Sequence, residues 1–74
     1  MPELDCKGLR CPMPIVRIGL AIRELAIGEQ LAVEANDPAF QPDLTAWTRK
    51  TGHKLVHFEP GPPQRALIEK VGAP

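Results

Sequence analysis

The sequence is poor in aromatic residues and has no excess of charge of either sign. Its 74 residues include no tyrosine and only three aromatic side chains, Phe40, Trp47 and Phe58. A hydrophobic core must therefore consist mostly of Leu, Ile, Val and Ala. Lys and Arg together number nine, as do Asp and Glu, so the formal net charge is zero. This balance lacks the basic excess of a direct nucleic-acid binder, and we expect no such partner.

The chain also lacks a long apolar run. No stretch approaches the roughly 18 apolar residues of a membrane span, and the first five residues have no signal-peptide character. We therefore expect a cytoplasmic protein with no membrane partner. The length predicts a single domain over residues 1–74, with residues 72–74 as a C-terminal tail.

The sequence has only two cysteines, and they are predicted to lie in different structural environments. Cytoplasmic cysteines are more often catalytic, redox-active or metal-binding than disulfide-bonded. Cys6 lies in an alternating segment that predicts a strand, with Leu4 and Cys6 facing the core. In an extended chain Cys6 would lie about 16 Å from Cys11, too far for a disulfide unless the loop at Gly8 folds back. A redox pair of Cys6 and Cys11 stays open as an alternative.

The sequence does not predict a metal site or a cofactor. The cysteines lack the paired spacing of zinc ligands. His53 and His57 are four residues apart, so in a regular strand they share one face. We expect both on the solvent-facing side of the sheet.

Periodicity and turn residues predict six elements. The strands are expected at 3–6, 30–35, 53–59 and 65–71, and the first helix at 12–26. A second helix follows the cap at 36–38 and ends at 51–52; Pro42 either kinks its start or marks where it begins. The order βαβαββ predicts a two-layer α/β sandwich, with two helices on one face of a four-stranded mixed sheet. The order of the strands does not follow from the sequence.

The Cys-Pro-Met-Pro segment at residues 11–14 is the strongest candidate for a functional site. Proline suits the first helical position, which places Cys11 at the N-cap beside the open amides of the first turn. These amides, with Lys7, Arg10 and Arg17 nearby, favour an anion. We therefore predict a lowered pKa and a reactive thiolate at Cys11. The alternative is a buried, inert thiol.

Residues 4–16 closely resemble the TusA (SirA-like) family of small sulfur-carrier proteins, whose hallmark is a C-P-x-P motif after a Gly-Leu turn. The likeness continues through 36–40, 43–44, 46–47 and 51–53. It implies the same βαβαββ fold and a persulfide on Cys11. The resemblance implies that Gly8, Pro12 and Pro14 are motif positions that support the turn. Arg10 and Arg17 are expected to support the site through their positive charge.

The resemblance also implies partners. A cysteine desulfurase or a rhodanese-like protein would load the sulfur, and a downstream protein would accept it, in tRNA thiolation, molybdenum cofactor maturation or sulfur metabolism. Such a protein is a sulfurtransferase-type carrier more than a stand-alone enzyme. A binding or regulatory module that docks through Leu9, Met13 and Val16 is an alternative. We expect a monomer or a weak oligomer formed through Met13, Val16 and Leu20.

Overall fold

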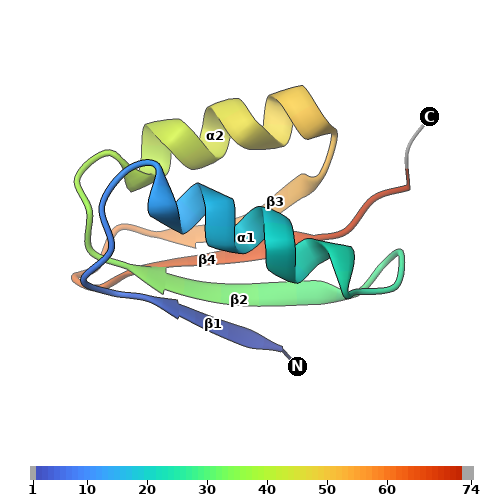
Figure 1. Cartoon of the computed structure of the whole chain (residues 1–74), viewed down its shortest axis with the longest axis horizontal. Coiled ribbons are helices and arrows are strands. Elements are labelled where there is room, and N and C mark those ends of the chain that lie inside the picture. Colours follow the sequence, from blue (N-terminus) through green and yellow to red (C-terminus); the bar gives the residue numbers. More distant parts are fainter. Residues whose placement is uncertain (1, 73–74) are drawn as a thin grey trace.

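Two helices cover one face of a four-stranded sheet, and the other face of the sheet is left uncovered (Figure 1). The structure is a computed structural model that describes residues 2–72, so residues 73–74 of the tail expected at 72–74 lie outside the described part. The elements in chain order are β1 (Glu3–Cys6), α1 (Met13–Arg23), β2 (Gln30–Ala35), α2 (Phe40–Thr51), β3 (Lys54–Glu59) and β4 (Gln64–Glu69). The predicted βαβαββ order and the two-layer architecture are confirmed.

The strand order brings two distant loops together. The sheet has the order β1-β2-β4-β3, in which β1 runs parallel to β2 and the remaining pairs are antiparallel. Cys6, the last residue of β1, is in register with Ala35, the last residue of β2. Because parallel strands end at the same edge, the segments 7–12 and 36–39 leave the sheet side by side (Figure 1).

The core lies between the helices and the covered face of the sheet. Helix α1 contributes Ile18 and Ile22, and α2 contributes Phe40 and Leu44, while Cys6 closes the core from β1 with no exposed surface. Burial of these apolar groups is the main stabilising contribution in a domain of this size. The prediction that Cys6 faces the core is confirmed.

Helix α1 is shorter at both ends than the predicted 12–26. Pro12 is its N-cap and Glu24 its C-cap. The amides of Glu24 and Leu25 bond to carbonyls three residues back, which tightens the last turn and stops the helix. The Lys70 ammonium group, just after β4, donates to the Leu25 carbonyl at 2.6 Å. This cation satisfies a carbonyl at the C-terminal end of α1 and interacts favourably with the helix dipole.

The flank of α1 is more exposed than its periodicity predicts. The apolar spacing in the sequence predicts that Val16 and Leu20 are partly buried, but they are 44% and 55% exposed. The same spacing places Ala26 in the apolar stripe, but Ala26 lies beyond the end of α1 and is exposed. The stripe that reaches the sheet is therefore narrow and is centred on Ile18 and Ile22.

The two histidines do not share a face, which corrects the sequence-based expectation. A register shift in β3 between Leu55 and His57 breaks the alternation, and His57 is exposed opposite Leu67. His53 precedes the strand and packs on Trp47, with ring centroids 5.3 Å apart. Its Nδ1 accepts the Val71 amide at 3.1 Å. His53 therefore supports the end of α2, where Gly52 adopts a left-handed conformation.

Gly8→Ala should lower the free energy of unfolding by about 1 kcal/mol, because Gly8 has a φ of +84° that an L side chain rarely adopts. Gly19→Ala is the matched control. Gly19 lies inside α1, and neither glycine has an atom within 4 Å of an added Cβ. Ala should therefore stabilise α1 at position 19 by up to about 1 kcal/mol. Urea unfolding of both variants tests this, and equal effects of the same sign would contradict it.

Candidate functional site

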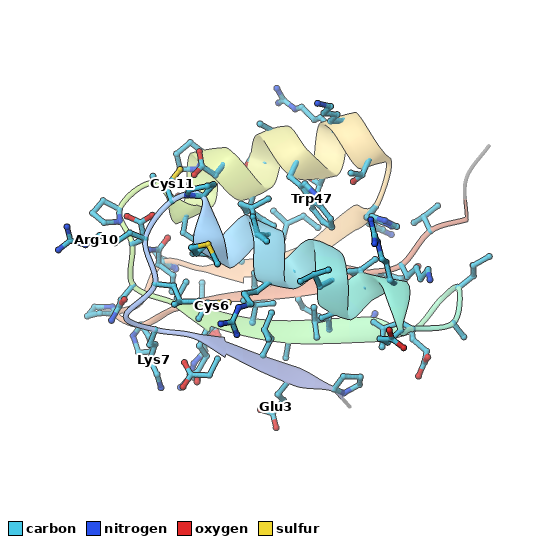
Figure 2. All side chains as sticks on the ribbon, viewed as in Figure 1. Glu3, Cys6, Lys7, Arg10, Cys11 and Trp47 are labelled. Carbon is cyan, nitrogen blue, oxygen red and sulfur yellow. The ribbon has the colours of Figure 1, made fainter. Side chains whose placement is uncertain are left out.

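Cys11 lies in the loop between β1 and α1, on the side of the molecule where α2 begins (Figure 2). Its side chain is exposed, whereas Cys6 is buried beneath it in the core (Figure 2). Both thiols are free. Cys11 is therefore not the buried thiol of the alternative interpretation, and the structure shows no disulfide between the two cysteines.

The carboxylate of Asp37 holds the Cys11 loop against the start of α2. Its Oδ2 accepts the Cys11 amide at 2.8 Å, and its Oδ1 accepts the Ala39 amide at 3.4 Å. The Asp37 carbonyl also accepts the Gln64 side-chain amide at 2.7 Å, which ties the same residue to β4. One aspartate therefore joins the Cys11 loop, the entry to α2 and the sheet.

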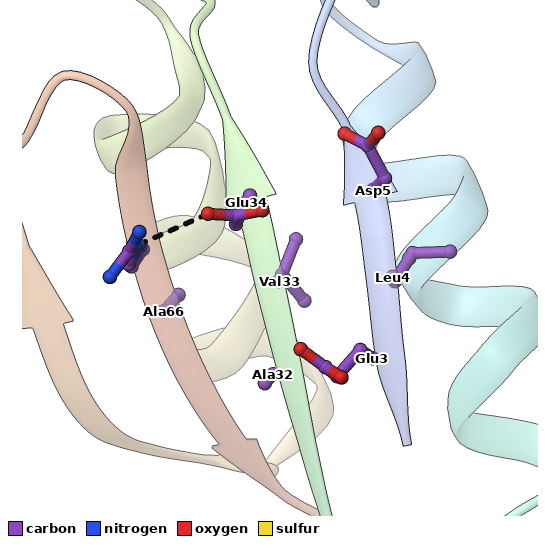
Figure 3. Close-up of a pocket in the computed structure, with 8 residues that line it drawn as sticks. Glu3, Leu4, Asp5, Ala32, Val33, Glu34 and Ala66 are labelled. Carbon is purple, nitrogen blue, oxygen red and sulfur yellow. Dashed lines mark hydrogen bonds and ion pairs between the residues drawn. The ribbon is translucent and has the colours of Figure 1, made fainter. Parts of the chain in front are cut away.

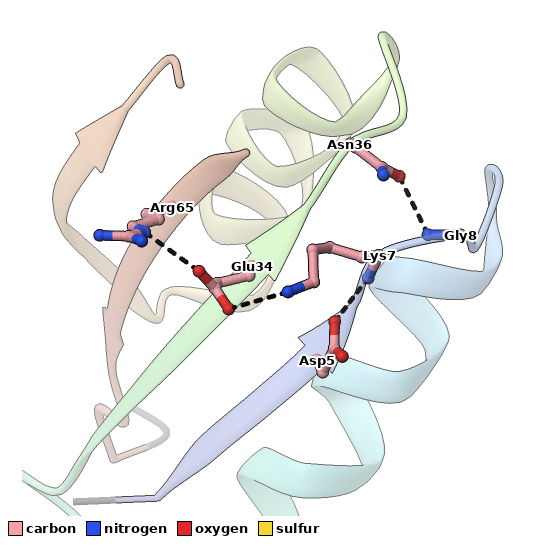
Figure 4. A network of polar contacts seen from close by, with 6 residues as sticks. All are labelled: Asp5, Lys7, Gly8, Glu34, Asn36 and Arg65. Carbon is pink, nitrogen blue, oxygen red and sulfur yellow. Dashed lines mark hydrogen bonds and ion pairs between the residues drawn. The ribbon is translucent and has the colours of Figure 1, made fainter. Parts of the chain in front are cut away.

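A second contact between the same two loops lies nearer to the ends of β1 and β2. The Gly8 amide donates to Asn36 Oδ1 at 3.0 Å (Figure 4). The Leu9 amide donates to the Cys6 carbonyl at 3.1 Å and closes the turn that follows β1. Positive φ at Gly8 allows this turn, so the role in the turn that the motif implies for Gly8 has a physical basis.

The start of α1 offers few open amides to a sulfur anion, which corrects the N-cap expectation. Pro12, and not Cys11, is the N-cap, since its carbonyl accepts the Val16 amide at 3.1 Å. The Met13 amide donates to the Arg10 carbonyl at 2.8 Å. Pro12 and Pro14 have no N–H, and the Cys11 amide is held by Asp37. Most of the donors at this helix start are therefore absent or already in use.

Two acidic side chains of the neighbouring loop and helix raise the pKa of Cys11, which corrects the predicted lowering. The largest cause is a hydrogen bond between the thiol and the Asp43 carboxylate, followed by desolvation and by the negative charges of Asp43 and Asp37. Asp43 lies in the first turn of α2. The charges near Cys11 in the sequence are basic, whereas the fold brings acidic charges to it from α2 and the loop before it.

The basic residues expected to support a thiolate act elsewhere. Arg10 projects outward from the loop and away from α2 (Figure 2). Arg17 acts on the buried thiol, where its charge opposes the desolvation that raises the pKa of Cys6. Lys7 pairs with Glu34 at 3.5 Å on the sheet. None of the three is among the charges that shift the Cys11 pKa.

Lys7 belongs to a polar network on the uncovered face of the sheet. Glu34 of β2 accepts from Lys7 and, at 3.1 Å, from Arg65 of β4 (Figure 4). This network borders a shallow hollow of about 480 Å³ that also has Glu3 and Asp5 on its rim (Figure 3). In residues 2–72, no group of three or more His, Cys, Asp or Glu side chains is placed to hold a metal ion.

An apolar groove of about 530 Å³ lies between the helices and begins beside the Cys11 loop. Pro12, Val16 and Leu20 line it from the α1 side, and Trp47 and His53 from the α2 side. Met13, at the loop end of α1, is 40% exposed. The exposed thiol is thus bordered by an apolar surface. No helix within residues 2–72 has the length and apolar character needed to cross a membrane.

Comparison with known proteins gives a consistent result. Residues 2–70 match the family described as "Sulfurtransferase TusA". Three relatives share the name "Putative sulfur carrier protein". YrkI of Bacillus subtilis is 53% identical over 72% of this chain and 71% of its own length. A protein of Archaeoglobus fulgidus is 41% identical over 80% of this chain and 77% of its own length. YrkF of Bacillus subtilis is 45% identical over 76% of this chain but only 30% of its own length.

Asp37→Ala should lower the free energy of unfolding by about 1–2 kcal/mol, because two amides lose their carboxylate acceptor. Amide hydrogen exchange at Cys11 should become faster. Asp37→Asn is the matched control, since its side-chain oxygen can keep one of the two bonds and should lose less. Unchanged exchange at the Cys11 amide in Asp37→Ala would contradict the role of this tether.

The rate of Cys11 alkylation by iodoacetamide should rise with a midpoint at higher pH than in an unstructured cysteine peptide measured in parallel. The reason is that the Asp43 carboxylate bonds to the protonated thiol and raises its pKa. Asp43→Asn should move the midpoint down, and Glu24→Gln, at the far end of α1, should not. Peptide mass spectrometry assigns the modified residue. A wild-type midpoint below that of the peptide would refute this electrostatic account.

Proposed function

Because the chain belongs to the sulfurtransferase TusA family, we propose that Cys11 accepts sulfane sulfur as a persulfide and passes it to a second protein. The family and the names of the relatives support the general role of sulfur carrier. The observation that carries the proposal is the exposed thiol of Cys11, fixed by its backbone amide at the meeting point of two loops.

The proposed reaction is an exchange between two sulfur atoms. The Cys11 sulfur attacks the outer sulfur of a donor persulfide, a new S–S bond forms, and the donor's own S–S bond breaks. The electron pair of the broken bond leaves with the inner sulfur of the donor, which becomes a thiol. The donor cysteine is reduced and Cys11 is oxidised, so no further oxidant is needed. Delivery to an acceptor thiol is the same reaction with Cys11 as the donor.

The donor in this proposal is a cysteine desulfurase or a rhodanese-like protein, and the acceptor is a downstream sulfur-accepting protein. The apolar surface beside Cys11, formed by Met13, Val16 and Leu20, supports contact with such partners, since exposed apolar patches often mark interaction sites. The proposal places the transfer in the cytoplasm, where thiols are kept reduced.

The thiol-redox alternative has less support. It requires a disulfide between Cys6 and Cys11, but Cys6 has no exposed surface and belongs to the same core cluster as Ile18 and Val33. Moving its sulfur to the loop would expose core surface and leave a cavity, at a free-energy cost of a few kcal/mol.

Incubation with a cysteine desulfurase and cysteine should add one sulfur atom to the wild-type protein and none to Cys11→Ser. The Ser hydroxyl cannot form a persulfide, and its small polar side chain is tolerated at an exposed position. Cys6→Ala is the control for the second thiol and should still gain one sulfur. Intact mass spectrometry before and after reduction measures the gain. Sulfur uptake by Cys11→Ser equal to that of the wild type would refute the proposal.

A further inference from the structure

We propose that Gln64, the first residue of β4, is a positioning residue for sulfur transfer at Cys11. Its side-chain amide fixes Asp37 to the sheet, and Asp37 in turn fixes the backbone amide of Cys11. This inference rests on the proposed function of Cys11 as a sulfur carrier and adds to it a residue from the opposite half of the chain.

The register of the sheet places Gln64 at the edge where the site is built. Gln64 is opposite Ala35, the last residue of β2, and Ala35 is opposite Cys6, the last residue of β1. Opposite residues in a sheet point to the same face, and Ala35 and Cys6 are both fully buried beneath the helices. The partly buried Gln64 side chain therefore lies on the covered face, at the edge from which the segments 7–12 and 36–39 leave the sheet.

Asp37 is engaged in hydrogen bonds through both its carbonyl and its carboxylate. The carbonyl oxygen, which has two lone pairs, accepts the Phe40 amide at 3.0 Å and the Gln64 side-chain amide at 2.7 Å. The carboxylate accepts the amides of Cys11 and Ala39. The bonds to Ala39 and Phe40 belong to the turn that Asp37 itself begins, so they move with it. Within residues 2–72, the Gln64 contact is the side-chain bond that anchors this turn to the sheet.

The chain connection between β2 and Asp37 does not replace this anchor. The ladder of β2 ends at Ala35, so Asp37 lies beyond the last residue that the strand pairing holds. Pro38 restricts the backbone conformation of Asp37, but rotation at Asn36 can still shift Asp37 and its turn relative to the sheet. The bond from Gln64 removes this freedom and thereby fixes the place of the carboxylate that holds Cys11.

The place of Cys11 matters because a docked donor delivers its sulfur from a fixed direction. The Cys11 sulfur must reach the outer sulfur of the donor persulfide. The proposed contact surface of Met13, Val16 and Leu20 lies on α1, which packs on the sheet through its own core residues. The loop must therefore be held in a defined position relative to α1, since a misplacement of about 1 Å can slow a reaction by up to about 100-fold.

A purely structural role for Gln64 makes a different prediction. Loss of the bond would then loosen the fold and alter the reaction of Cys11 with every donor, or it would alter none of these reactions. A positioning role slows transfer from a docked protein and leaves reaction with a small donor unchanged, because a small molecule can approach the exposed thiol from several directions.

The test compares wild type with Gln64→Met, which keeps the length and neutrality of the side chain but has no N–H donor. Gln30→Met is the matched control, because Gln30 also donates to a side chain, Glu69, at 3.3 Å, and lies at the opposite end of β2. Circular dichroism checks folding, and Gln64→Ala replaces Gln64→Met if the latter does not fold.

Two sulfur donors are used for each protein. A persulfide-loaded cysteine desulfurase, freed of excess cysteine, is mixed with rising concentrations of excess carrier, and intact mass spectrometry follows the first-order transfer. The plateau rate measures transfer within the complex, and the half-saturating concentration measures docking. Glutathione persulfide is the small donor, and its loading rate is measured in the same way. Amide hydrogen exchange at Cys11 reports how firmly its loop is held.

We expect Gln64→Met to lower the plateau rate about fivefold or more, with the half-saturating concentration and the rate of loading by glutathione persulfide both within about twofold of wild type. Exchange of the Cys11 amide should become faster, because Asp37 has lost its anchor on β4. Gln30→Met should match wild type in all four measurements.

Three outcomes would overturn the inference and leave the proposed function intact. They are an unchanged plateau rate in Gln64→Met, a parallel fall in loading from both donors, and an equal loss of plateau rate in Gln30→Met. If wild type itself takes no sulfur from either donor, the proposed function fails, and the inference fails with it.

Discussion

The hydrogen bond from the Cys11 amide to the Asp37 carboxylate is the contact on which the site depends. It joins the loop after β1 to the loop after β2, and these loops meet only because the two strands are parallel neighbours that end in register. The same carboxylate starts the turn into α2. The position of Cys11 is thus set by the sheet topology and by a hydrogen bond from its backbone amide to one aspartate.

This arrangement has an electrostatic consequence. Asp37, before α2, and Asp43, in its first turn, hold the pKa of Cys11 above its ordinary value. The site favours a neutral thiol at rest. A resting thiol of this kind is protected from indiscriminate reaction, since the thiolate is the nucleophilic form. Reaction then requires a partner that brings a reactive sulfur to Cys11 and a group that takes up its proton.

Much of the fold follows from the sequence, because the signals that define it are local. The alternation at 3–6 and 30–35, the apolar spacing around Ile18 and Ile22, and the prolines between β3 and β4 each depend on neighbouring residues. The errors arise where a distant contact decides the outcome. The register shift in β3 lies between His53 and His57, so the two side chains do not share a face of the sheet. Lys70, near the other end of the chain, donates to a carbonyl at the end of α1.

The site was predicted in part, for the same reason. The position of Cys11 at the start of α1 and the burial of Cys6 follow from local patterns. The electrostatic environment of Cys11 does not follow from local patterns. Asp37 and Asp43 act on Cys11 because the strand order brings their segment beside the Cys11 loop, and the sequence does not reveal this order. Asn36 and Asp37 are recognisable in the sequence as a helix cap, but their bonds to Gly8 and Cys11 cross the gap between two loops.

The most direct test of the account is to isolate the protein from cells that express it, trap its thiols by rapid alkylation, and map the products by tandem mass spectrometry. The account predicts an extra sulfur atom between Cys11 and the alkyl group in a fraction of the molecules, and none at Cys6. An extra sulfur on Cys6, or on neither cysteine while the cell's donor proteins are loaded, would contradict it.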